Sequence, residues 1–203
     1  MANKIITIGR QYGSGGREIG KKLADAMGIP FYDKALLAVA AKESGYCEEI
    51  LADYDEKPVG SLLYSLFMGS TGGTESLPLN QKMFLAQFDA IKKIAAQGPC
   101  VIIGRCADYA LRENPNCVNV FVHAGLEVRV KRLMRLYNMT AESAEQTAVK
   151  RDKQRASYYN FYADKKWGSL DHYHLVVDSG AVGIDNTVEL IRAFAEMERP
   201  KGI

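Results

Sequence analysis

The sequence lacks the features of a membrane, secreted or nucleic-acid-binding protein. No apolar run approaches the roughly 20 residues of a membrane-spanning helix, and the N-terminus has no apolar segment of the kind found in a secretory signal. Neither sign of charge is in large excess, because 26 Lys and Arg against 24 Asp and Glu leave a net charge of only +2. This near balance argues against a broad nucleic-acid-binding surface. We therefore expect a cytoplasmic protein with neither a membrane nor a nucleic acid among its partners.

Cysteine and histidine are too few and too scattered to predict a disulfide or a metal centre. The 4 cysteines form no C-x-x-C pair, and none of the 3 histidines stands at metal-ligand spacing from them. His172 and His174 form an H-x-H pair, but no third ligand lies nearby in the sequence. We interpret the cysteines as small buried apolar residues in a reducing compartment. They are Cys47, Cys100, Cys106 and Cys117.

Short apolar segments alternate with helical patterns along the chain. Most of these segments are near-continuous runs of Val, Ile, Leu and Phe, which are typical of parallel strands covered on both faces. The predicted strands are Ile5–Ile8, Ile29–Tyr32, Cys100–Ile103, Val118–Val122 and His174–Val177. The predicted helices are Arg17–Met27, Ala35–Lys42, Gln81–Ala96, Leu126–Tyr137 and Asn186–Met197. This alternation predicts one α/β domain, residues 1–203, built on a five-stranded parallel sheet.

The stretch 34–98, between the second and third predicted strands, contains no clear strand. We interpret it as a helical insertion at the carboxyl edge of the sheet, where ligands bind in open α/β folds. Asp33 and Lys34 stand at its start, where a substrate could be gripped. A helix cap is the alternative interpretation of Asp33.

A glycine-rich turn connects the first strand to the first helix. Gly13, Gly15 and Gly16 fall in this turn, which would point several backbone N–H groups at one spot beside a helix N-terminus. In the phosphate-binding pattern G-x-x-x-x-G-K-S/T the lysine position is held here by Gly16, and Arg17 and Glu18 follow. The turn therefore has a phosphate cradle without its usual cation or its usual magnesium-binding hydroxyl. A tight strand-to-helix connection is the simpler alternative.

Arginines follow the strands or share a helix face. Arg10 and Arg17 flank the glycine-rich turn, and Arg105 directly follows the third predicted strand, beside that turn. Arginine binds phosphate through a bidentate fork that lysine cannot make. Arg151 and Arg155 are four residues apart, so they can act together from one helix face.

Two further groups of side chains have structural alternatives. Arg129, Arg132 and Arg135 are spaced by three, so they share a face of a predicted helix. A solvated helix face is the alternative interpretation of these basic residues, and we prefer it for Lys131 and Lys150. Aromatic and basic residues interleave over 156–168. Such a run can stack nucleobases, but we favour packing or a homodimer contact, with one or two tyrosines lining a nucleotide site.

Four segments stand in an order that can be compared with known families. They are Ile6–Ile19, Val101–Arg105, Lys150–Arg155 and Val176–Val188. In this order they resemble the nucleoside monophosphate kinases, and specifically the cytidylate kinase-like family. There the corresponding segments are an altered P-loop, a strand with an arginine that meets the acceptor phosphate, an arginine-bearing lid, and the adenine-side loop with the final helix. The resemblance covers nearly the whole chain.

The resemblance implies a three-layer P-loop NTPase fold with a helical acceptor-binding insertion at 34–98 and a lid at 150–168. It implies an ATP-dependent phosphotransferase that uses Mg²⁺. The residues that would bind ATP are Arg10, Gly13, Ser14, Gly15, Gly16, Arg17, Glu18 and Ser179. Ser14 or Glu18 would contact the metal ion. The acceptor would be bound by Asp33, Lys34 and Arg105. The catalytic residues would be Arg17, Arg105, Arg151 and Arg155, with Arg17 or Arg10 replacing the P-loop lysine.

The sequence also departs from the cytidylate kinases. They carry a lysine where this chain has Gly16, and aspartates beside the Gly-Arg pair where this chain has Ile103 and Cys106. The first candidate reaction is transfer of the γ-phosphoryl group of ATP to CMP or dCMP. Two alternatives stay open: a non-catalytic nucleotide-binding protein, and a kinase whose acceptor is a small molecule other than a nucleotide.

Overall fold

The computed structural model of the 203-residue chain describes residues 4–33 and 79–198. Five parallel strands form one sheet in the order β2-β3-β1-β4-β5. The strands are β1 Ile5–Arg10, β2 Phe31–Tyr32, β3 Cys100–Ile103, β4 Cys117–His123 and β5 Leu175–Asp178. The predicted number and direction of strands are therefore confirmed. β2 is shorter than predicted because the N–H of Ile29 bonds to Ala24 at the end of a helix and Pro30 has no N–H.

The described helices account for most of the predicted ones. They are α1 Gly16–Met27, α5 Leu79–Gln97, α6 Ala107–Ala110, α7 Leu126–Tyr137, α8 Ala141–Ala163, α9 Ser179–Val182 and α10 Ile184–Glu196, with a short 3₁₀ turn at Leu170–His172. The helix predicted at 35–42 and most of the predicted insertion, 34–78, lie outside the described residues.

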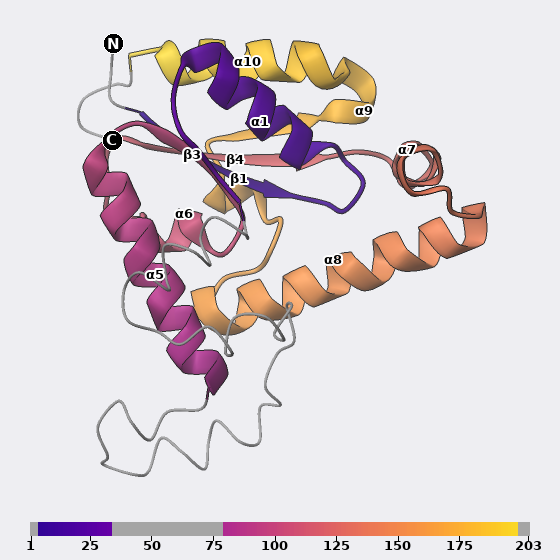
Figure 1. The fold of residues 1–203 in the computed structure, drawn as a ribbon, viewed down its shortest axis with the longest axis horizontal. Helices are drawn as coiled ribbons and strands as arrows, with labels where there is room; N and C mark the ends of the chain where they lie inside the picture. The colour runs from indigo at the N-terminus through magenta and orange to yellow at the C-terminus, as the bar shows by residue number, and fades with distance from the viewer. Residues whose placement is uncertain (1–3, 34–78, 199–203) are drawn as a thin grey trace.

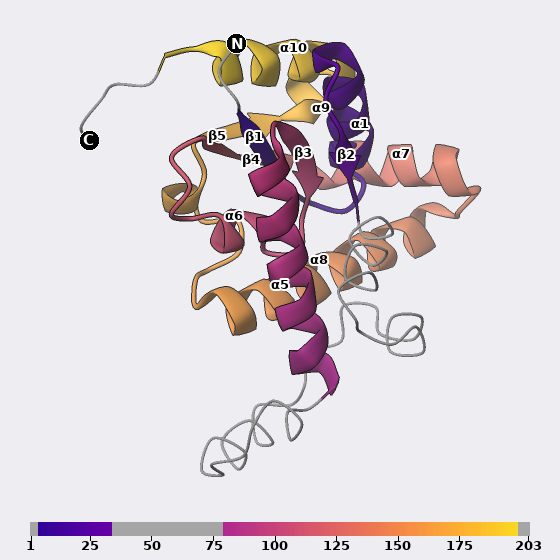
Figure 2. The same cartoon turned by 60° about the vertical axis from the view of Figure 1, so that its left-hand side comes forward.

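The molecule has three layers (Figure 1). Side chains of a strand alternate between the two faces of the sheet. Ile6 and Ile8 accordingly pack with α1 and α10 on one face, whereas Ile5 packs with Ile91 of α5 and with α6 on the other. Figure 2 shows α5 lying along this second face. The predicted three-layer α/β fold is confirmed.

The lid predicted at 150–168 begins inside a helix that starts earlier than expected. α8 runs unbroken from Ala141 to Ala163, and the hydroxyl of Thr140 caps it by accepting the N–H of Ser143 at 3.2 Å. The aromatic run at its end packs within the molecule: the rings of Phe84 and Tyr162 stack with centroids 4.1 Å apart. This contact joins α5 to α8 and confirms the packing interpretation of the aromatic run.

The described cysteines behave as small apolar residues. Cys100, Cys106 and Cys117 are buried and unpaired by disulfides, and burial raises the pKa of Cys100 to about 12. Within 4–33 and 79–198, no cluster of three or more His, Cys, Asp and Glu side chains has metal-binding geometry. In the same ranges no helix combines the length and apolar character required to cross a bilayer.

Gly20 sets the close approach of α1 to the sheet and supplies a stability test. A Cβ atom there would overlap Cδ1 of Ile103 and lie 3.3 Å from Cδ1 of Ile8, and both isoleucines are buried. We expect Gly20→Val to lower the free energy of unfolding by about 1–3 kcal/mol through overpacking, measured by urea denaturation. Gly125→Ala is the control, because no atom lies within 4 Å of its Cβ position. Equal losses in both variants would contradict the close packing of α1 against the sheet.

Candidate functional site

The glycine-rich turn lies between β1 and α1, at the carboxyl edge of the sheet. Gly13 and Gly15 have φ values of 82° and 84°, which favour glycine. Gly15 is also the N-cap of α1, and it has no side chain that could cap this helix end. The first N–H groups of α1 are therefore available to an anion, as in phosphate sites at helix N-termini.

Two serines predicted to contact ATP fasten this turn. The Ser14 hydroxyl donates to the carbonyl of Gln11 at 2.9 Å, and Ser14 is buried. The Ser179 hydroxyl lies 2.6 Å from the carbonyl of Ser14 and 2.9 Å from that of His123. These hydroxyls thus tie the turn to itself and to the ends of β4 and β5.

A buried ion pair anchors the same turn to α7 and α8. Nη1 of Arg129 lies 2.6 Å from Oδ2 of Asp152, and 8% and 15% of the two side chains are exposed. Arg129 also donates to the carbonyls of Ala124 and Tyr12, at 3.0 and 3.1 Å. The other Asp152 oxygen accepts the N–H of Tyr12 at 2.7 Å. Arg129 is therefore a structural residue, buried in the molecule rather than part of a solvated helix face.

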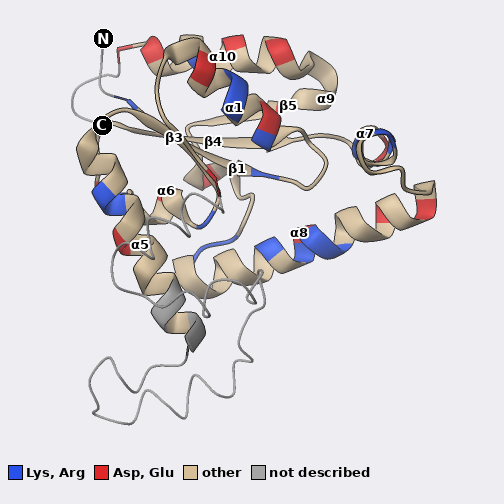
Figure 3. Cartoon of the chain, viewed as in Figure 1, with Lys and Arg blue, Asp and Glu red and all other residues tan. Residues whose placement is uncertain are grey.

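Cations from several elements meet at a cavity of about 440 Å³ in front of the turn. β1, α1, α7 and α8 each contribute arginine, and Figure 3 shows basic positions at the end of β1 and along the middle of α8. The cationic residues that line the cavity are Arg10, Arg17, Lys21, Lys22, Arg132 and Arg155. Gly13, Gly15, Gly16 and Glu18 line it as well. Most of the residues predicted to bind ATP are thus brought together.

Arg155 reaches the glycine-rich turn from α8. Its Nη1 donates to the carbonyl of Arg10 at 3.0 Å, and its guanidinium lies 5.3 Å from the ring centroid of Tyr12. Arg151, one turn earlier, lies 3.5 Å from the side-chain oxygen of Gln154. Arg151 and Arg155 lie on the same helix, as their spacing predicted. Of these two described residues, Arg155 lines the cavity and Arg151 does not.

Arg105 and Arg10 line one small cavity at the ends of the neighbouring strands β3 and β1. Gly104 has a φ of 68°, and a Cβ atom there would overlap Nη1 of Arg10, so the Arg10 side chain crosses directly over Gly104. Arg105 itself has a φ of 58°, and its guanidinium lies 5.7 Å from the ring centroid of Tyr158. This strained conformation of a non-glycine residue is typical of functional sites.

Arg17 faces the end of β2. Its Nε and Nη2 atoms both donate to Oδ2 of Asp33, at 3.0 and 2.7 Å. The Arg17 side chain is 71% exposed, whereas that of Asp33 is only 14% exposed. Arg17 therefore joins the start of α1 to the strand end where a substrate was predicted. Lys34, the other predicted substrate residue, lies outside the described residues.

Glu18, a predicted metal contact, is engaged by cations. Its carboxylate pairs with Nη2 of Arg132, and Nζ of Lys22 lies 3.7 Å away. The other predicted contact, the Ser14 hydroxyl, donates into the turn. Carboxylate and phosphate oxygens are the ligands that Mg²⁺ prefers, so in this arrangement the metal would depend mainly on phosphate oxygens.

Asp108, which was not among the predicted site residues, lines the same small cavity as Arg105. Oδ2 of Asp108 accepts the hydroxyl of Tyr159 at 2.5 Å. Desolvation raises the pKa of Asp108, and burial with the neighbouring carboxylate raises that of Tyr159. The bond joins α6 to α8. The one sequence signal for Asp108 was its position three residues after Arg105.

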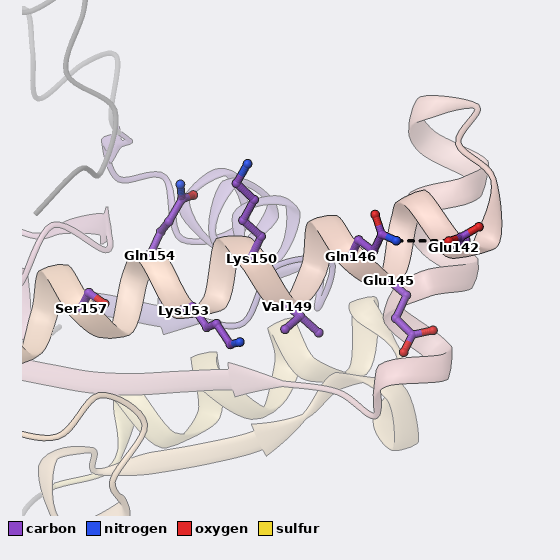
Figure 4. Close-up of a pocket in the computed structure, with 8 residues that line it drawn as sticks. All are labelled: Glu142, Glu145, Gln146, Val149, Lys150, Lys153, Gln154 and Ser157. Atoms are coloured by element: carbon purple, nitrogen blue, oxygen red, sulfur yellow. Dashed lines mark hydrogen bonds between the residues drawn. The ribbon is translucent and has the colours of Figure 1, made fainter.

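A second cavity adjoins the turn on the side of β5. It measures about 370 Å³ and is lined by Ser14, Val128, Ser179, Gly183 and Ile184, with the cations Lys131, Arg132 and Arg135. A larger hollow of about 780 Å³ follows one outer stripe of α8, from Glu142 to Ser157 (Figure 4). None of the described residues that line this larger hollow comes from a strand end. The strand-end cavities are therefore the candidate site.

Comparisons with known proteins give the family. The sequence matches the cytidylate kinase-like family over residues 5–181, and the chain belongs to that family. An uncharacterized protein from Eubacterium ventriosum is 29% identical, with a TM-score of 0.75 over 96% of this chain and 99% of that chain. A comparison with curated proteins found no match.

Two more distant structures share the fold. A shikimate kinase from Bacteroides thetaiotaomicron has a TM-score of 0.52 at 16% identity, over 96% of this chain and 99% of that chain. A gluconokinase from Sinorhizobium meliloti has a TM-score of 0.51 at 16% identity, over 96% and 95%. The resemblance predicted from the sequence is thus confirmed at the level of family and fold.

Replacing Asp152 tests the buried ion pair with Arg129 that anchors the glycine-rich turn. Asp152→Ala leaves the buried Arg129 charge without its carboxylate, so we expect it to lower the free energy of unfolding by about 3 kcal/mol or more, measured by urea denaturation. Glu127→Gln is the control, because its pair with Lys131 lies on the surface, with both side chains more than 70% exposed. The anchor is refuted when Asp152→Ala unfolds at the same urea concentration as the parent.

Proposed function

We propose that the protein is a kinase that transfers the γ-phosphoryl group of ATP to a small-molecule acceptor. One observation carries the proposal: arginines from four elements meet an uncapped helix N-terminus and its glycine-rich turn at one cavity. Phosphoryl transfer demands positioning and neutralisation of charge on phosphate oxygens, rather than covalent chemistry by the protein. The site contains the groups for both tasks.

The donor side accommodates a nucleoside triphosphate. The two cavities have Gly13 and Arg132 in common, so a nucleotide can extend from one into the other. The β5-side cavity has apolar walls from Val128 and Ile184, which suit a base. The backbone N–H groups at the start of α1 suit the phosphates, with Arg10 and Arg17 nearby. Bound ATP would supply the transferable group, and Mg²⁺ would neutralise charge on its phosphate oxygens.

The acceptor side lies at the ends of β2 and β3. Arg105 would hold the acceptor's anionic group, and Asp33 would fix its orientation from the neighbouring strand. The ion pair of Arg17 with Asp33 links this side to the donor turn. Arg151 and Arg155 would neutralise the phosphoryl group as it moves, because α8 carries them beside the turn.

The nature of the acceptor is the finer part of the proposal. CMP or dCMP is the first candidate, because the family resemblance includes the strand-end arginine. Two of the structural neighbours are named as kinases of shikimate and gluconate, which are not nucleotides. A non-catalytic nucleotide-binding protein is the second candidate function, favoured by Gly16 at the lysine position and by Glu18 being paired with Arg132.

An acceptor panel separates these candidates. The full-length protein is incubated with ATP and Mg²⁺ in the presence of CMP, dCMP, the other nucleoside monophosphates, shikimate or gluconate, and ADP is measured. We expect acceptor-dependent ADP with CMP or dCMP. ADP formation with only a non-nucleotide would reassign the acceptor. Tight ATP binding without ADP for any acceptor would favour the non-catalytic candidate.

Replacing Arg155 tests the proposed charge neutralisation. We expect Arg155→Ala to lower kcat by about 100-fold with little change in the KM for ATP, because contacts made in the transition state act on turnover. Lys153→Ala is the matched control, since Lys153 is exposed and lies on the outer stripe of the same helix (Figure 4). A normal kcat with a raised KM would instead assign Arg155 to ground-state binding.

A further inference from the structure

The cation nearest the N-cap of α1 comes from α7, not from the glycine-rich turn. The Cζ and Nη2 atoms of Arg132 lie 3.2 and 3.4 Å from the position that a Cβ atom would occupy at Gly15. Arg17 is directed to Asp33, and Arg10 crosses over Gly104. Of the described arginines, Arg132 is thus the one whose guanidinium lies against Gly15, the N-cap residue of α1.

This placement has an electrostatic cost that an anion removes. The N-terminus of a helix carries a partial positive charge, so a guanidinium beside it is unfavourable unless a negative group is present. Glu18, in the first turn of α1, pairs with Arg132 and supplies one such group. The Arg132 side chain is only 14% exposed, so its position is fixed, whereas the Glu18 side chain is 44% exposed.

Arg132 also stands where the two strand-end cavities join. It lines the cavity in front of the turn and the cavity beside β5, and Gly13 is the other residue common to both. A ligand with its base in one cavity and its phosphates in the other must pass this guanidinium. The usual source of this charge, a lysine in the glycine-rich turn, does not fit at Gly16. A Cβ atom there would lie 2.6 Å from Cβ of Arg10, which leaves no room for a lysine side chain.

We propose that Arg132 binds the donor triphosphate and supplies the positive charge that the glycine-rich turn lacks, with Glu18 holding its guanidinium in place. The inference rests on the proposed function, because it concerns the donor side of that same site. It assigns the missing charge to a helix that follows the turn by more than 100 residues in the chain. It also gives Glu18 the role of a positioning residue rather than that of a metal ligand.

Binding of ATP and of inorganic tripolyphosphate, measured by calorimetry, tests the assignment. Arg132→Ala is expected to weaken the binding of both ligands by about tenfold or more, the effect of losing a charge-assisted hydrogen bond. Arg192→Ala is the matched control, since it also breaks an arginine–glutamate pair, with Glu189, but lies on α10 and lines neither cavity. Weaker binding of ATP with unchanged binding of tripolyphosphate would place Arg132 at the base and overturn the proposal.

A double variant removes the remaining ambiguity. In Arg132→Ala the unpaired Glu18 carboxylate could repel phosphate by itself. The loss should therefore persist when Glu18→Gln/Arg132→Ala is compared with Glu18→Gln alone. Recovery of tight tripolyphosphate binding in the double variant would show that repulsion by Glu18 caused the loss, and would overturn the role of Arg132. Thermal unfolding of each variant verifies that its fold is intact.

The outcomes also separate this inference from the proposed kinase activity. A parent protein that binds neither ATP nor tripolyphosphate overturns both. A parent that binds both ligands but forms no ADP in the acceptor panel overturns the kinase activity, while a loss in Arg132→Ala still supports the donor-binding role. Equal binding by the parent and Arg132→Ala overturns only the role of Arg132.

Discussion

The buried ion pair of Arg129 with Asp152 is the interaction on which the geometry of the site depends. It takes two charges out of water, which is costly unless their remaining hydrogen-bonding groups are satisfied. Here they are: Arg129 also donates to two carbonyls, and Asp152 also accepts the N–H of Tyr12. Because Tyr12 belongs to the glycine-rich turn, one pair fixes α7, α8 and the turn relative to one another. Arg155 then reaches the turn because α8 is held there.

Close approach of backbone elements is the second constraint. Side chains occupy the space beside the glycines of the turn: Ile184 and Arg132 beside Gly15, and Arg10 beside Gly16. The same contacts that exclude larger residues bring the end of β1, the middle of α7 and the start of α10 together at the turn. The shape of the phosphate cradle therefore depends on packing. Its glycines are required because neighbouring side chains leave no room for a Cβ atom, and at Gly13 and Gly15 also because the backbone has a positive φ.

The fold was largely predictable from the sequence, because apolar runs and helical periodicity encode local structure and layer order. The starts and ends of elements were less so: α8 begins nine residues before the predicted lid at Lys150, since its first turns are polar and lack a clear apolar stripe. The positions of Arg10 and Arg105 at strand ends were predictable, because each closely follows an apolar run in the sequence. The partners of Glu18 and Asp152 were not, because they come from α7, and pairing across elements leaves no local pattern.

The three arginine–carboxylate pairs of the site differ in burial, and this difference indicates which of them a phosphate could enter. Arg129 and Asp152 are both nearly buried, so a ligand that replaced either partner would leave the other charge buried without its counter-charge. Arg132 with Glu18 and Arg17 with Asp33 each have one substantially exposed side chain, Glu18 in the first pair and Arg17 in the second. Partly exposed ion pairs are weak, so the exposed partner of each pair can shift at little cost when a multiply charged anion binds. The buried pair thus holds the framework, while the two partly exposed pairs orient guanidinium groups at the glycine-rich turn and at the end of β2, where the proposed function requires phosphate oxygens to bind.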